Sequence, residues 1–117
     1  MSKPIYHITS RQAWSADHAA DGYRGDSLDV EGFIHCSTID QVLRVANTWY
    51  TAQHGLVLLK IDPARLTPEM RWEAGSDKPD ELFPHLYGAI NLDAVVEIID
   101  FEPDHNGIFT LPSSLTL

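Results

Sequence analysis

The sequence is poor in the residues on which disulfide-rich, zinc-binding and nucleic-acid-binding proteins depend. Its 117 residues include one cysteine, Cys36, which excludes an internal disulfide and a cysteine-rich zinc site and fits a reducing compartment. Lysine and arginine total 8 against 17 aspartates and glutamates, so the formal net charge is −9, and the basic residues form no cluster. Because phosphate contacts need a concentrated positive field, we expect no duplex nucleic acid as a partner.

Long apolar segments are also absent. The start, Met1 to Pro4, lacks the apolar core of a signal peptide, and no window approaches the ~20 apolar residues of a membrane span. No repeat, low-complexity tract or linker divides the chain. We therefore expect one domain over residues 1–117, in a soluble, cytoplasmic protein without a membrane partner. The sequence leaves the oligomeric state open.

Capping boxes and hydrophobic periodicity predict two helices in the first half of the chain. The first begins after Thr9, ends near Asp21 and Gly22, and turns Ala13, Trp14 and Ala20 inward. The second begins after Thr38 and carries apolar side chains at spacings of three and four: Ile39, Val42, Leu43, Ala46, Trp49 and Tyr50. Trp14 and Trp49 are both predicted to lie in the core.

Short apolar or β-branched runs predict strands at 5–9, 33–37, 56–61, 70–73, 94–101 and 108–111. The run at 56–61 is apolar except for Lys60, which suits a central strand buried on both faces. The segment 23–32 is interpreted as a loop, and 83–88 as a structured turn. Helices near the front followed by strands predict an α+β fold, not alternating βαβ units.

Three histidines, His7, His35 and His85, lie within or beside apolar segments, where an unpaired imidazole would be costly to bury. Strand geometry puts His7 on one face with Thr9, and His35 on one face with Ser37. Each histidine alone is best explained as a core imidazole with local partners. Together, and on faces that also carry hydroxyl groups, they predict one polar cleft.

Two other chemistries involve the same residues. Three imidazoles and a water can form a catalytic zinc site, but no His-x-His or HExxH spacing is present, so we expect no metal. Cys36 lies on the opposite side of its strand from His35, which cannot activate it. A dyad of Cys36 with His7 or His85 stays open, although a cysteine flanked by apolar residues is more often an inert core thiol.

Glu73 and two tyrosines complete the candidates. Glu73 shares a predicted strand face with Arg71 and follows an aromatic residue, so it is either a base, an electrostatic stabiliser or one half of an exposed ion pair. Tyr23 and Tyr87 each neighbour a glycine and can place a ring beside a ligand, as well as in the core.

Several segments form a recognisable set of motifs: Tyr6-His7-Ile8-Thr9, Trp14, Glu31-Gly32-Phe33-Ile34-His35-Cys36-Ser37, Gln41, Arg71-Trp72-Glu73 and Phe83-Pro84-His85-Leu86-Tyr87-Gly88. Together they resemble the DUF952 family of small bacterial and plant proteins. The resemblance covers nearly the whole chain, and Gly-Phe-Ile-His-Cys-Ser and Phe-Pro-His-Leu-Tyr-Gly are its most specific strings.

The front half is also similar to the ADP-ribosyltransferase superfamily, especially its RNA 2′-phosphotransferase branch. In that branch a strand with His-x-Thr is followed by a helix, a Gly-aromatic turn and a second strand with a histidine and a serine. The resemblance implies a split, curved and mostly antiparallel sheet. It also implies that His7 and Thr9 contact the nicotinamide ribose of NAD, and that His35 and Ser37 line the nicotinamide pocket.

The third catalytic position, a glutamate that polarises the ribose in typical members of the superfamily, falls to His85 or Glu73. The function implied is binding of NAD or an ADP-ribose compound as a small-molecule substrate, followed by transfer or hydrolysis of ADP-ribose. The residues expected to bind it are His7, Thr9, Tyr23, His35, Ser37 and Tyr87, and those expected to be catalytic are His7, His35, Glu73 and His85. Two other classes stay open: a non-catalytic small-molecule or protein-binding module, and a histidine-based metal-dependent hydrolase.

Overall fold

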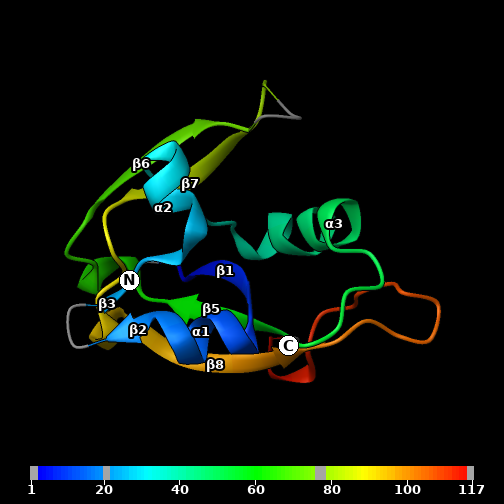
Figure 1. The fold of residues 1–117 in the computed structure, drawn as a ribbon. Coiled ribbons are helices and arrows are strands. Elements are labelled where there is room, and N and C mark those ends of the chain that lie inside the picture. The colour runs from blue at the N-terminus through cyan, green and yellow to red at the C-terminus, as the bar shows by residue number, and fades with distance from the viewer. Residues whose placement is uncertain (1–2, 20–21, 76–78, 116–117) are drawn as a thin grey trace.

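The computed structural model describes residues 3–19, 22–75 and 79–115, and in this part of the chain two three-stranded antiparallel sheets form the framework (Figure 1). The first has the strand order β1-β5-β8, from β1 (Ile5–Ser10), β5 (Leu56–Ile61) and β8 (Val95–Phe101). The second has the order β4-β7-β6, from β4 (Ile34–His35), β7 (Leu82–Tyr87) and β6 (Glu69–Ala74). A short antiparallel pair joins β2 (His18–Ala19) and β3 (Gly22–Tyr23). The predicted α+β fold with antiparallel pairing is confirmed.

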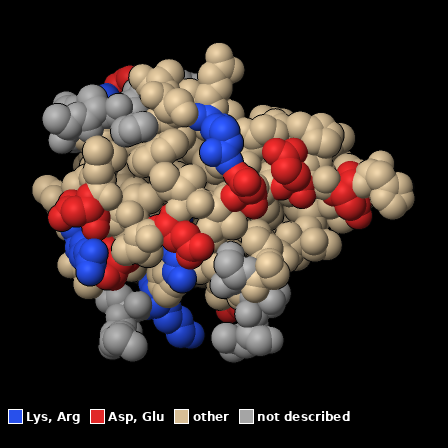
Figure 2. Space-filling view, turned by 90° about the horizontal axis from the view of Figure 1, so that it is seen from below, with Lys and Arg blue, Asp and Glu red and all other residues tan. Residues whose placement is uncertain are grey.

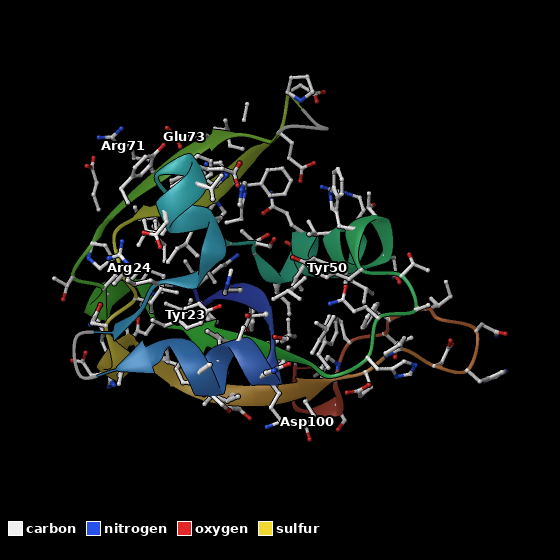
Figure 3. The ribbon with its side chains drawn as sticks, viewed as in Figure 1. Tyr23, Arg24, Tyr50, Arg71, Glu73 and Asp100 are labelled. Atoms are coloured by element: carbon white, nitrogen blue, oxygen red, sulfur yellow. The ribbon has the colours of Figure 1, made fainter. Side chains whose placement is uncertain are left out.

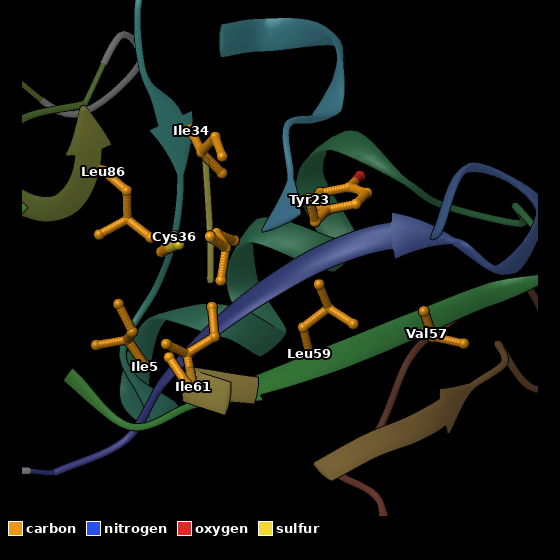
Figure 4. Close-up of a cluster of buried hydrophobic side chains, with 10 residues drawn as sticks. Ile5, Tyr23, Ile34, Cys36, Val57, Leu59, Ile61 and Leu86 are labelled. Carbon is orange, nitrogen blue, oxygen red and sulfur yellow. The ribbon is translucent and has the colours of Figure 1, made fainter. Parts of the chain in front are cut away.

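Strand β5 is the centre of the first sheet, as its apolar run predicted. Its side chains alternate between two buried clusters on opposite faces of the sheet. Leu58 belongs to the cluster beneath the helix at 39–49, and Leu59 to the cluster that also contains Tyr23 (Figure 4). Both leucines are fully buried. The sheet therefore has no solvent-facing side at its centre.

The helices are α1 (Arg11–Asp17), α2 (Gly25–Glu31) and α3 (Ile39–Trp49), and short 3₁₀ turns lie at Pro63–Arg65, Leu92–Ala94 and Ser113–Leu115. Helix α3 begins with the predicted capping box, in which the Thr38 backbone N–H donates to Gln41 Oε1 at 3.0 Å. Val42 and Ala46 are fully buried, as predicted. The prediction for Trp49 is wrong: its side chain is 59% exposed. The helix ends at this residue, and Tyr50 packs against the core instead.

The first helix is shorter than predicted. Ser10, not Thr9, caps it, because Ser10 Oγ accepts from the Ala13 N–H at 2.9 Å. It ends at Asp17 since the next two residues pair as β2 with β3. Trp14 packs partly buried against the core, as predicted, with its ring 5.5 Å from that of Tyr23. The predicted helix end at Asp21 and the inward-facing Ala20 lie outside the described residues.

The predicted loop at 23–32 is wrong, because it contains β3 at its start and then α2. Arg24 pairs with Asp29 at 2.6 Å along this segment. Gly32 ends α2 in a left-handed conformation, with φ of 88°, and the chain then turns into β4. The predicted strand at 33–37 is reduced to two residues, although Ser37 still forms a bridge with Tyr6 of β1.

The predicted turn at 83–88 is also wrong, since these residues form most of β7, the middle strand of the second sheet. Proline argues against a central strand in sequence, because it cannot donate to the ladder. Here the Pro84 carbonyl accepts from the Cys36 N–H at 3.0 Å, so the proline nitrogen also faces β4, at the point where β4 ends. The hydrogen bond that Pro84 cannot donate is therefore missing only at the end of the pairing between β4 and β7, and not in its middle.

The predicted strand at 108–111 is absent from the described residues. Phe109 is buried, but its backbone pairs with a side chain: its N–H donates to Asn47 Oδ1 at 2.8 Å and its carbonyl accepts from Asn47 Nδ2 at 3.1 Å. The Asn47 amide thus supplies both the acceptor and the donor that a neighbouring strand would give to the Phe109 backbone, so Phe109 is satisfied without pairing in a sheet.

Several charged side chains on the surface lie next to a group of opposite sign. On the face seen in Figure 2, acidic groups are scattered and several lie beside a lysine or arginine. Arg11 pairs with Asp100, and Lys60 with Glu97, across neighbouring elements. Among the described residues, no helix is long and apolar enough to cross a membrane.

Candidate functional site

His7, His35 and His85 line one cleft of about 920 Å³, which confirms the predicted convergence of residues from distant parts of the chain. Strand β1 supplies His7, β4 supplies His35 and β7 supplies His85. The rings of His35 and His85 lie 5.2 Å apart, since these two residues are paired across β4 and β7. Thr9, Tyr23 and Ser37 also line the cleft.

The His7 imidazole is held in one tautomer. Its Nδ1–H donates to the His35 carbonyl at 2.6 Å, and because a carbonyl only accepts, the proton must lie on Nδ1. Burial lowers the pKa of His7 to about 4, and the nearby His35 ring adds to this, although the hydrogen bond to the carbonyl opposes it. At neutral pH, His7 Nε2 is therefore an unprotonated hydrogen-bond acceptor.

This arrangement predicts a stability change with pH. The His7 pKa is about 4 in the folded protein and near 6.5 in an unfolded chain, so between these values the unfolded state binds a proton that the native state does not. The free energy of unfolding should therefore fall as the pH drops from about 6.5 to about 4. Urea denaturation over this range measures it.

A His7→Asn variant should show a weaker pH dependence in the same experiment. The control is His54→Asn, because His54 is exposed and pairs with Glu102 away from the cleft. Equal slopes of unfolding free energy against pH in the wild type and His7→Asn would contradict the assignment.

His85 is held by a carboxylate. Its ring is buried, and its Nδ1–H donates to Glu73 Oε1 at 2.9 Å. The Tyr87 hydroxyl donates to the same oxygen at 2.5 Å, and the Arg71 guanidinium lies 4.5 Å above the Tyr87 ring. Hydrogen bonds from Tyr87 and then His85 lower the pKa of Glu73, and the same bond raises the pKa of Tyr87. Glu73 is therefore ionised at neutral pH.

The two candidates for the third position thus take different places. His85 lines the cleft, whereas Glu73 on β6 and Tyr87 on β7 lie beside it on the same face of the sheet and are not among the lining residues. Figure 3 shows Glu73 and Arg71 at β6, the edge strand of the second sheet. A carboxylate behind an imidazole fixes the tautomer and stabilises the protonated ring. Glu73 can position His85, and of the two it is His85 that lines the cleft.

Aromatic and acidic groups surround the two paired histidines. The Phe33 ring stacks on His85 at 4.3 Å and meets the His35 ring edge-on at 4.8 Å. His35 is half-exposed, and its Nε2 lies 2.9 Å from Glu31 Oε2. Glu31 and Asp29 both line the cleft. Sequence reasoning did not include these acidic residues in the site, although Glu31 stands four residues before His35.

The hydroxyl groups lie deeper. Thr9 Oγ1 and the Tyr23 hydroxyl are 2.7 Å apart and hydrogen-bond each other, and both residues are buried. The Tyr23 ring is 5.7 Å from that of His7. Cys36 is buried, and burial raises the pKa of its thiol, which disfavours the thiolate that a Cys–His dyad needs.

The described residues contain no group of three or more His, Cys, Asp and Glu side chains placed to hold a metal ion. In both His7 and His85 the Nδ1 atom is already used by a protein acceptor. The cleft also includes Trp49 and Val45 of α3, which sequence reasoning assigned to the core or left out. No sequence signal distinguishes Trp49 from the other members of its apolar stripe.

The fold and the cleft define a small α+β protein with histidines from three strands at one site. A family described as "Protein of unknown function (DUF952)" matches residues 8–98, and the chain belongs to this family. The chain is similar to protein CC0527 from Caulobacter crescentus. Compared with the crystal structure of CC0527, the sequence identity is 34%, the match covers 98% of this chain and 100% of the CC0527 chain, and the TM-score is 0.84. The solution NMR structure of CC0527 is 33% identical over 97% of each chain, with a TM-score of 0.80. No curated protein matches.

Proposed function

We propose that the histidine cleft binds NAD or another ADP-ribose compound and that the protein transfers or hydrolyses its ADP-ribose group. One observation carries the proposal. His7 and His85 both use Nδ1–H for a protein acceptor, and no described residue pairs with Nε2 of either ring. No buried side-chain nitrogen or oxygen among the described residues lacks a partner, so both Nε2 atoms are accessible, and both residues line the cleft.

The unprotonated Nε2 of His7 in the cleft suits a ligand with hydroxyl groups. A ribose hydroxyl of the substrate would donate to His7 Nε2, which the low pKa of His7 keeps unprotonated. With a pKa of about 4, His7 is a weak base, so its role is to orient the ribose and not to remove a proton. The similarity of the front half to ADP-ribosyltransferases is part of this proposal, in which His7 contacts the nicotinamide ribose.

The acidic wall suits the charge that the reaction develops. The nicotinamide of NAD is a cation, and breaking its bond to ribose C1′ leaves an oxocarbenium-like centre while the electron pair goes to the nicotinamide nitrogen. Glu31 and Asp29 would favour both cationic forms, and His35 would be held beside the ring by Glu31. In this scheme the His35 and Ser37 face is the nicotinamide pocket.

His85 is the candidate base for the second half of the reaction. A water or an acceptor hydroxyl would form the new bond to C1′ and pass its proton to His85 Nε2. Glu73, ionised and bonded to His85 Nδ1, would stabilise the imidazolium that results. Glu73 is then a positioning residue, and the catalytic residues are those that face the cleft.

Calorimetric titration of the wild-type protein with NAD and ADP-ribose tests the proposal, followed by chromatographic detection of free nicotinamide. We expect heat and a raised melting temperature with both ligands, because a ligand that binds only the folded state stabilises it. Binding without nicotinamide release would identify a binding module. Absence of heat at millimolar concentrations of both ligands would reject the proposal, and tight binding of one equivalent of zinc would favour a hydrolase.

A further inference from the structure

Trp49 is a large apolar side chain that the fold leaves uncovered. It lies on the apolar stripe of α3, one turn beyond the fully buried Ala46, yet 59% of its surface is exposed. Exposing an indole ring forgoes much of the stabilisation that its burial would give. Trp49 is not far from the candidate site: it lines the same cleft as the three histidines.

Part of the lining of the cleft is apolar and comes from two elements. Helix α3 contributes Val45, Trp49 and Tyr50, and the β6–β7 hairpin contributes Gly75 and Phe83. Phe83 is buried and fixed by its neighbour: a Cβ on Gly75 would lie 2.6 Å from Phe83 Cε1, so only glycine lets the ring lie so close to the backbone. These side chains form a wall without charged groups.

The size of the cleft leaves room for a second ring. Its volume of about 920 Å³ is near the upper end of the roughly 300–1,000 Å³ that small-molecule sites span. One ribosyl unit with a nicotinamide would fill only part of it. The cationic nicotinamide is attracted to the end with Glu31, which leaves the uncharged wall for a neutral ring.

We propose that Trp49 is a stacking platform for the purine ring of the ligand, at the end of the cleft away from Glu31. This inference rests on the proposed function, since it assigns the adenine end of an ADP-ribose compound. Indole rings stack well on flat heteroaromatic rings, and loss of one base–aromatic stack weakens binding by roughly 5- to 150-fold. Trp49 thereby selects ligands that carry a nucleobase at that end.

The test compares Trp49→Ala, Trp49→Phe and Trp72→Ala in titrations with ADP-ribose and with nicotinamide riboside, which has no purine. Trp49→Ala should bind ADP-ribose roughly 5- to 150-fold more weakly and nicotinamide riboside unchanged, while Trp49→Phe stays within a few-fold of the wild type. Trp72 is the matched control, because it is 47% exposed and does not line the cleft. Unchanged ADP-ribose affinity in Trp49→Ala would overturn the inference.

Adenosine separates this inference from the proposed function. Its binding should weaken in Trp49→Ala and be unchanged in His7→Asn, and it should quench the fluorescence of Trp49 in Trp72→Phe but not in Trp49→Phe. If His7→Asn loses NAD while Trp49→Ala binds adenosine and ADP-ribose normally, the stacking platform is rejected and the proposed function stands. If the wild type binds adenosine but neither NAD nor ADP-ribose, the proposed function fails; if it does not bind adenosine, the platform fails.

Discussion

Replacing Leu58 with alanine is expected to lower the free energy of unfolding by about 2 to 5 kcal/mol, a large part of what a domain of this size has. Leu58 is the middle of β5 and is fully buried. It packs beneath α3 with Val42 and Ala46 and beside Ile99 of β8. Since elements from both halves of the chain meet around it, the cavity left by alanine cannot be filled by a local shift.

The matched control is Leu82→Ala. Leu82 is also in a strand, but its side chain is 54% exposed, so its loss should change the free energy of unfolding by no more than about 0.5 kcal/mol. Urea denaturation followed by far-UV circular dichroism measures both variants. Equal effects of the two substitutions would mean that β5 is not the centre of the core.

The elements that sequence predicted best are those whose signal is local. The capping box and apolar spacing of α3, and the uninterrupted apolar run of β5, depend on neighbouring residues in the chain. The convergence of His7, His35 and His85 was also predicted, because three costly side chains in apolar strands need a common polar surface. In each case the types and spacing of the residues are enough to predict the structure.

The errors arise where a distant partner decides the structure. Pro84 argues against a strand until β4 is seen to end beside it, and the backbone of Phe109 has its partner in the Asn47 side chain. Trp49 has the spacing of a core residue, but among the described residues none buries its side chain, which is 59% exposed at the end of α3. The residues next to Pro84, Phe109 and Trp49 in sequence do not predict these tertiary contacts.

The choice between Glu73 and His85 has the same origin. Both residues are polar and near aromatic side chains in sequence, and either can serve as a base. Cross-strand pairing places Arg71 opposite His85 and Glu73 opposite Phe83, so the carboxylate lies on the same face of the sheet as the imidazole, on the neighbouring edge strand. Strand register, which the sequence does not reveal for a segment interpreted as a turn, brings Glu73 within hydrogen-bond distance of His85, the one of the two that lines the cleft.

A large effect on ligand binding is expected from His7. In His7→Asn the side-chain amide can still donate to the His35 carbonyl, as Nδ1–H does in the wild type, but the acceptor at Nε2 is lost. If a ribose hydroxyl donates to Nε2, that hydroxyl is left buried without a partner, at a cost of about 1 to 3 kcal/mol. Affinity for NAD and ADP-ribose should therefore fall roughly 5- to 150-fold.

His54→Asn is the control for this substitution, because it makes the same chemical change at an exposed histidine that pairs with Glu102 outside the cleft. Its affinity for NAD should equal that of the wild type. Circular dichroism and the urea midpoint at pH 7 should show that His7→Asn is folded, since the bond between β1 and the His35 carbonyl is kept. A folded His7→Asn protein that binds NAD as tightly as His54→Asn would remove His7 from the site, because the nitrogen proposed to meet the ribose would then contribute nothing to affinity.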